Sequence, residues 1–420
     1  MGTASSALGT RQKWIAMIGR WALPLVMMIT GVIVDFGAEA GATTRPTVPI
    51  GVICSCTGPE AASLSQTTPA IQAWAAWVNH HGGLNGQQVQ LIVKDDGYSP
   101  ATSSADAEEL IQQNHVVAII DNSDVDASWS SYAKQQGVPV IGGGISVDGY
   151  TNPDFFPPSA TFNYLPSAGA VLAKSYGLKK EADLYCAEVS ICAQSEVLSK
   201  AADADVGIAM VYATAIGFAA PNYTAQCLAA KAAGATMMVV GDATTVVEKV
   251  AENCAAQGYT PIESSSDGTV AIGWLNTPGM EGNIDTQADV PWFIHNAATK
   301  DMYAALAKYA QQVPAGPNFG EIVLATWADG ALIQAAVEAA HVSSASTISA
   351  GEIKAGLYGL PKGETLGGLA PPLHFVKGQP ANNSCFFAMA IKHHKFVLLR
   401  DGKLVCSPLH KAGWSGLGST

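Results

Sequence analysis

Short polar side chains and glycines gather in loops that directly follow predicted strands in the first half of the chain. These loops read CSCTGPEAASLS (54–65), DNSDVDAS (121–128) and GGGIS (142–146). In an open parallel sheet, such loops lie together beyond the carboxyl ends of the strands. They lead into helix N-termini, whose free N–H groups attract small polar or anionic groups. The pattern therefore indicates a binding site for a small molecule.

The second half of the chain repeats this arrangement. Segments 189–191 and 241–244 each follow a predicted strand, and so does the pair Asp267-Gly268. These loops extend the predicted binding site to the second half of the chain.

Each of these polar groups also has a purely structural use. Asp124 and Asp126 can cap the helix predicted at 128–136. Residues 142–144 can form a strand-to-helix turn, and Asp267 before a glycine is a common turn residue. The sequence leaves both uses open.

Common catalytic motifs are absent from the sequence. It contains no GxSxG elbow, no HExxH, no GxxxxGK and no GxGxxG after a strand. The neighbouring histidines 80–81 and 393–394 point in different directions on a helix or a strand, so they do not suggest metal ligands. We expect a binding protein rather than an enzyme, with no cofactor and no metal ion.

Hydrophobic periodicity predicts the elements that position these loops. A helix over 70–81 ends at the glycine pair 82–83, which takes a left-handed C-terminal conformation without penalty. A strand follows over 87–94. Ser99 and Pro100 then supply an N-cap and a first helical residue for the next helix.

Strands over 49–56 and 116–121 complete a β-α-β-α-β order, which favours a parallel, doubly wound sheet. The alternation resumes near residue 182, after the proline-rich segment 151–166. That segment suits a crossing between two lobes.

The first of these regions resembles a known family. Thr57-Gly58-Pro59 after the first strand, NHHGGLNG (79–86) and DDGYSPATS (95–103) look like the branched-chain amino-acid-binding type of periplasmic protein. These are type I solute-binding proteins of ABC importers. The similarity runs from about residue 49 to 406 and is weakest at its end.

The resemblance implies an α/β fold with two doubly wound parallel-sheet lobes joined by a three-crossing hinge. Helices predicted at 301–313 and 321–341 would return to the first lobe, and the C-terminal strands to the second. The expected parts are a signal peptide (1–40), an N-terminal lobe (46–161 plus 289–365) and a C-terminal lobe (162–288 plus 366–410).

The resemblance also implies which residues contact the ligand between the lobes. They are Ser63, Ser123, Asp124, Gly144, Ile145, Ser146, Ser190, Ala243 and Asp267. By this resemblance Asp267, which precedes a glycine as the acid of the amino-acid binders does, would pair with a ligand ammonium group in a charge-assisted contact. Ser63 stands where the family carries an aromatic residue, so that stacking surface is missing. Asp124 would repel the carboxylate of an amino acid. An amide, a polyol, a small aromatic compound or a peptide fragment therefore stays open beside an amino acid.

Composition agrees with an exported, two-domain protein. The chain has 420 residues, of which 48% are hydrophobic and 13% charged, so it can bury a large core. A net charge of −12 without a long basic run argues against nucleic acid. A basic start, the apolar run 21–34 and Ala38-Glu39-Ala40 form an export signal. The apolar run is short for a membrane span, although an uncleaved anchor stays open.

All eight cysteines follow the signal, as export to an oxidising space suggests. Their places along the chain suggest the pairs Cys385–Cys406, Cys186–Cys192 and Cys227–Cys254. Cys54 and Cys56 remain, and they could form a strained bridge or a thiolate metal site. Cys186 and Cys192 are expected to bracket a single loop.

We therefore expect a periplasmic or extracellular receptor that closes on a small polar solute and presents it to a membrane permease. The expected protein is a monomer. The alternative is an exported sensory or regulatory receptor that uses the same fold without a transport role, and an enzyme is a third class.

Overall fold

The computed structural model describes residues 47–144, 146–265, 269–342 and 346–406, without the side chain of Ser190. These residues belong to one compact unit, Arg45–Thr420. The predicted signal segment and the predicted contacts Ile145 and Asp267 lie outside the described residues.

The first lobe is built on a parallel sheet with the strand order β2-β1-β3-β4-β5. The order reverses between β1 and β3, and the carboxyl ends of such a strand pair flank the crevice where open α/β sheets bind ligands. The strands are β1 (Thr47–Cys54), β2 (Gln88–Asp95), β3 (Ala118–Asn122), β4 (Val140–Gly142) and β5 (Phe155–Phe156).

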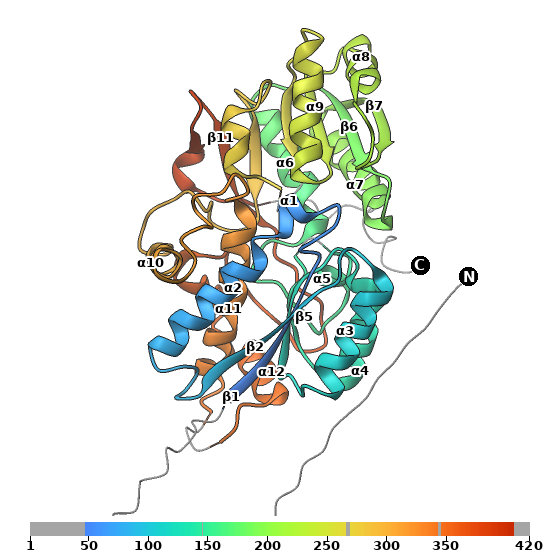
Figure 1. Cartoon of the computed structure of the whole chain (residues 1–420). Helices are drawn as coiled ribbons and strands as arrows, with labels where there is room; N and C mark the ends of the chain where they lie inside the picture. The colour runs from blue at the N-terminus through green and yellow to red at the C-terminus, as the bar shows by residue number, and fades with distance from the viewer. Residues whose placement is uncertain (1–46, 145, 266–268, 343–345, 407–420) are drawn as a thin grey trace, which may run out of the picture. The chain divides into compact units, whose positions relative to one another are not determined.

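Helices cover both faces of this sheet (Figure 1). One face packs against α2 (Thr67–His80), α10 (Lys300–Tyr309), α11 (Glu321–Ala339) and α12 (Ala350–Gly359). The other face packs against α3 (Pro100–Gln112) and α4 (Ser130–Gln136). α11 is long and apolar enough to span a membrane, but 67% of that stretch is buried in the lobe, as in a core helix.

The second lobe contains a parallel sheet with the order β7-β6-β8-β9, which reverses between β6 and β8. Its strands are β6 (Lys180–Cys186), β7 (Ala209–Ile216), β8 (Met237–Gly241) and β9 (Ile262–Ser265). α8 (Thr224–Ala233) and α9 (Thr244–Ala256) cover one face, while α6 (Leu165–Ser175) and α7 (Ser190–Val206) cover the other.

An antiparallel sheet extends the second lobe. β11 (Cys385–Ile391) pairs with β10 (Ile284–Gln287), with β12 (Phe396–Leu398) and with β13 (Val405–Cys406). The shorter helical segments are α1 (Ala61–Leu64), α5 (Asp148–Thr151), η1 (Asp126–Ser128), η2 (Phe162–Tyr164), η3 (Ile272–Asn276), η4 (Leu366–Gly368) and η5 (Arg400–Gly402).

The chain crosses between the lobes at segments that hydrogen-bond to one another. Ala160 donates its N–H to the carbonyl of Ala288 at 3.1 Å, and Thr161 donates to the carbonyl of Asn383 at 2.8 Å. The Asn383 amide donates in turn to the carbonyl of Ser159 at 2.8 Å. These contacts bring all three crossings into one hinge, as the predicted fold class requires.

Local signals in the sequence place most elements correctly. Ser99 accepts a hydrogen bond from the N–H of Thr102 at the start of α3, with Pro100 as the first helical residue. Gly83 follows α2 with a φ of +79°, and a Cβ there would lie 1.9 Å from the carbonyl oxygen of Gln87. Only glycine therefore fits this turn.

Two details differ from the sequence interpretation. Cys186 and Cys192 do not bracket a single loop, because α7 begins at Ser190 and Cys192 lies in its first turn. α12 was not predicted, although Ser349 and Glu352 form a capping box at its start.

The core of the first lobe includes Leu369, Leu373 and Phe375. These residues fall in the segment 366–410 that was expected in the second lobe. The domain boundaries otherwise stay a prediction.

The structure joins Cys186–Cys192, Cys227–Cys254 and Cys385–Cys406 as predicted, and it also joins Cys54 to Cys56, the bridge that the sequence left open. Cys227 and Cys254 link α8 to α9. Because Cys54 and Cys56 are bonded to each other, they are not available as thiolate ligands.

Candidate ligand-binding cleft

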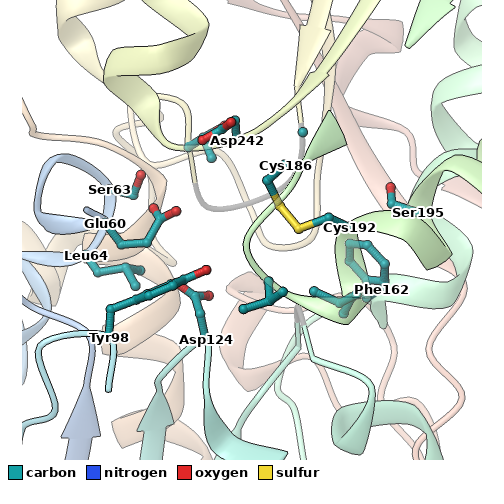
Figure 2. A pocket seen from close by; sticks show the side chains of 14 residues that line it. Glu60, Ser63, Leu64, Tyr98, Asp124, Phe162, Cys186, Cys192, Ser195 and Asp242 are labelled. Carbon is teal, nitrogen blue, oxygen red and sulfur yellow. A yellow bond between two sulfur atoms is a disulfide. The ribbon is translucent and has the colours of Figure 1, made fainter. Parts of the chain in front are cut away.

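A cavity lies where the switch points of the two parallel sheets face each other. Its empty volume is about 650 Å³, including the part that opens to solvent. It is lined by residues from both lobes and from the hinge: Glu60, Ser63, Leu64, Tyr98, Asp124, Phe162, Cys186, Val189, Ile191, Cys192, Ser195, Gly241, Asp242 and Thr269 (Figure 2). The loops after β1, β3, β6 and β8 all contribute, as the strand orders predict.

The first lobe brings Glu60, Ser63 and Leu64 to the cavity through the short helix α1. This helix packs against α9 of the second lobe. The Ser63 hydroxyl accepts a hydrogen bond from the N–H of Thr244 at 3.0 Å and lies 3.2 Å from the Thr244 hydroxyl. Ser63 therefore connects the lobes directly across the cleft.

Tyr98 reaches the cavity from the turn between β2 and α3. Its φ is +67°, a conformation that its N–H stabilises by donating to Asp96 Oδ1 at 2.8 Å. The ring makes an edge-to-face contact with Phe218 of the second lobe, with centroids 5.7 Å apart. Figure 2 shows the hydroxyl end of Tyr98 directed toward the middle of the cavity.

The second lobe supplies Asp242, which directly follows β8. Its side chain is 5% exposed, and its Oδ1 accepts a hydrogen bond from the N–H of Ala243 at 2.7 Å. The Cys186–Cys192 disulfide and Phe162 lie across the cavity from Glu60 and Tyr98 (Figure 2).

Burial and mutual repulsion raise the pKa values of the acidic groups around the cavity. The pKa of Glu60 rises to about 7, chiefly because of burial, against the lowering effect of a hydrogen bond with Ser63. Burial also raises the pKa of Asp242 to about 7. The pKa of Asp124 lies well above its usual value, because of burial and then the charges of Glu60 and Asp96.

The structure places two of the predicted contacts, Ser63 and Asp124, in the lining of this cavity. Asp124 makes no cap for α4, because no side chain caps that helix. Ser190 begins α7, beside the lining residues Val189 and Ile191.

Other predicted contacts are used inside the fold. Ser123 donates to Asp96 Oδ2 at 2.5 Å, and with Gly144 it lines a different cavity, in the first lobe. The Ser146 hydroxyl accepts the N–H of Gly149 at 3.0 Å. Ala243 is buried, and Asp242 before it is the residue that faces the cleft.

The sequence interpretation missed the aromatic residues of the cleft. No aromatic residue stands at Ser63, but Tyr98 and Phe162 line the cavity from other segments. Glu60 and Asp242 were also missed, although each lies within a loop that was predicted to face the ligand. Their positions after β1 and β8 were the available signal.

Within the described ranges, no group of three or more His, Cys, Asp and Glu side chains is arranged to hold a metal ion. The cleft instead combines carboxyl groups with apolar and aromatic walls, which suits an organic molecule.

A family model described as a periplasmic binding protein matches residues 47–395. The chain belongs to the type I periplasmic binding proteins. Members of this family are solute-binding proteins of ABC-transporter type, and they work outside the cytoplasm. No curated protein sequence matches this chain.

Solved structures share the fold at low identity. A branched-chain amino acid ABC transporter protein from Thermus thermophilus with bound valine is 15% identical, covers 87% of this chain and 97% of its own, and has a TM-score of 0.76. A leucine-binding protein from Thermotoga maritima is 15% identical, covers 86% and 99%, and has a TM-score of 0.69. A solute-binding protein from R. palustris in complex with benzoate is 16% identical, covers 86% and 98%, and has a TM-score of 0.70.

Proposed function

We propose that this binding protein captures a small polar solute, an amino acid or a related compound, between its lobes and delivers it to an ABC permease. The observation that supports this most directly is the cavity itself. It is lined from both lobes at the switch points of their sheets, where closure removes a ligand from water and strengthens each polar contact.

Hinge closure is the mechanism we propose. The three crossings are held together by hydrogen bonds between backbone and side-chain groups around Ala160, Ala288 and Asn383. The lobes meet across the cleft at Ser63–Thr244 and Tyr98–Phe218. Movement about the hinge would break these cleft contacts and leave the hydrogen bonds within each lobe's sheet intact.

The finer details of the proposal follow the sequence. The export signal at 1–40 would bring the protein to the periplasm or the cell exterior as a monomer, with or without removal of the signal. The lining residues Ser63 and Asp124, together with Glu60, Tyr98 and Asp242, would contact the solute.

Small-angle scattering with and without ligand tests the closure. A bound ligand should reduce the radius of gyration and raise the melting temperature by mass action. Ligands would come from a calorimetric screen of amino acids, amides, amines and carboxylic acids. If a compound binds tightly and neither quantity changes, the proposed closure is wrong.

Deletion of the gene separates transport from sensing. We expect uptake of the bound solute to fall. Unchanged uptake with lost induction of other genes would favour a sensory receptor, and conversion of the solute by the purified protein would indicate an enzyme.

A further inference from the structure

Carboxyl groups from both lobes meet at the cleft without a basic partner. Glu60 and Asp124 come from the first lobe and Asp242 from the second, and the carboxyl ends of Glu60 and Asp124 are directed into the cavity (Figure 2). No lysine, arginine or histidine is among the described residues that line the cavity.

Asp242 has an oxygen that the protein leaves unpaired. Its Oδ1 accepts the N–H of Ala243, but its buried Oδ2 has no hydrogen-bond partner in the structure. The side chain is more than nine-tenths buried and lines the cavity. A buried carboxylate oxygen without a partner is costly, and a donor on a ligand would remove that cost.

Most of the remaining lining is apolar or aromatic, and the hydroxyl residues Ser63, Ser195 and Thr269 complete it. The apolar and aromatic part includes Leu64, Phe162, Val189, Ile191 and the Cys186–Cys192 disulfide. Aromatic faces attract organic cations. Tyr98 stands beside the carboxyl groups of Glu60 and Asp124, and Phe162 lies across the cavity from them (Figure 2). A hydrated metal ion would gain nothing from these walls.

We propose that the ligand of this cleft is a protonated organic amine with an apolar body and no carboxylate of its own. This inference depends on the proposed function, because it names the class of solute that the same cavity takes. The ammonium group donates to Asp242 and lies between it and the first-lobe carboxylates, so it bridges the lobes and favours closure.

Proton release on ligand binding gives a further test of this proposal, and it depends on the groups that surround each carboxyl group. Glu60 faces Ser63, Asp242 and Glu188, and Asp124 faces Glu60 and Asp96. Asp242 faces the Ala243 N–H and Glu188, with Tyr98 and Tyr223 nearby. The helix α9, which packs against α1, carries the cation Lys249, whose Nζ donates to the carbonyl of Ala220 and lies 5.8 Å from the Tyr223 ring centroid.

The carboxyl groups of Glu60 and Asp242 are partly protonated at neutral pH in the empty cleft, because burial raises the pKa of each to about 7. An ammonium group binds only their ionised form. Amine binding should therefore release protons, and its affinity should rise between about pH 5.5 and about pH 8.

Isothermal titration with matched probes tests the proposal. One series is isoamylamine, leucine and 4-methylpentanoate, and the other is phenethylamine, phenylalanine and 3-phenylpropanoate. Within at least one series we expect the amine to bind about tenfold or more tightly than both partners that carry a carboxylate, because each good charge contact is worth about that factor.

Two variants locate the ammonium group. Asp242→Asn should weaken amine binding about tenfold and abolish part of the proton release. Asp301→Asn, which removes an exposed carboxylate on α10 outside the cavity lining, should leave both unchanged. Equal losses in the two variants would overturn the assignment to Asp242, and a melting curve on each variant shows whether it is folded.

The outcomes separate the ligand class from the function. Tight binding of an acid, a zwitterion or a neutral compound, with closure in scattering, overturns the amine and keeps the solute receptor. Saturable binding of Mg²⁺ or Ca²⁺ that displaces the amines also overturns the amine. Absence of closure with every compound that binds overturns the proposed function itself.

Discussion

The second lobe buries carboxyl groups in two different surroundings: Asp183 and Glu263 within its parallel sheet, and Asp242 at the cleft. Asp183 on β6 and Glu263 on β9 are each 1% exposed and each keeps one oxygen without a hydrogen bond, as Asp242 does. Burial raises the pKa of Asp183 to about 8 and that of Glu263 well above its usual value. Only Asp242 lines the cleft cavity.

The comparison shows that an unpaired buried carboxyl group does not by itself mark a binding site. Asp183 and Glu263 lie within the sheet and can become neutral by taking up a proton, which suits a structural role. Asp242 borders a space that is large enough for an organic molecule and is bounded by aromatic side chains. The cavity beside Asp242, rather than its buried charge, therefore distinguishes it from Asp183 and Glu263.

The largest expected effect concerns buried carboxyl groups that do not line the cleft cavity, in either lobe. Because the folded-state pKa values of Asp183, Asp126 and Asp203 are raised to about 8, 7 and 7, the folded protein binds protons more tightly than the unfolded chain. Stability should therefore rise as pH falls from about 8 toward about 4, where unfolded carboxyl groups also protonate.

Each unit of pKa shift corresponds to about 1.4 kcal/mol, so the unfolding free energy should gain several kcal/mol over this range. Urea unfolding at several pH values measures it. Greatest stability at about pH 8 would show that these groups are ionised in the fold, which would remove the contrast with the cleft.

Neutralising one carboxyl group of each set sharpens the comparison. Asp183→Asn should raise the unfolding free energy at about pH 8 by about 1 to 3 kcal/mol, have little effect near pH 4, and leave ligand affinity unchanged. Asp242→Asn should also be tolerated by the fold but should weaken binding. Weakened binding in Asp183→Asn without loss of fold would contradict the division into two sets.

A smaller effect is expected at the contact between the lobes. Ser63→Ala removes the hydrogen bonds to Thr244 and should reduce ligand affinity about fivefold, since one such bond contributes about 1 kcal/mol. The nearby Ser65→Ala provides a matched control. If scattering shows the same closed population in both variants, the Ser63 contact does not stabilise the closed form.

The sequence was sufficient for much of the fold because the decisive signals are local. Ser99 and Pro100 specify the start of α3, and the glycines after α2 specify its end. The order of these elements then fixes a parallel sheet. α12 was not predicted, although its start carries a local signal too, the capping box of Ser349 and Glu352.

The cleft was harder to predict, because contacts between residues far apart in the sequence decide which side chains face it. Ser123 lies in a predicted loop, but Asp96 binds its hydroxyl within the first lobe. Tyr98 faces the cavity only because its turn adopts a positive φ and the second lobe brings Phe218 against it. Neither fact is visible in the residues around position 98.

Native mass spectrometry of the protein purified from its own cells tests the account most directly, because a closed receptor retains its guest. We expect a guest that dissociates on unfolding, is identified as an amine without a carboxylate, and is lost or depleted in Asp242→Asn. A carboxylic acid retained equally by both proteins would contradict the account of the cleft.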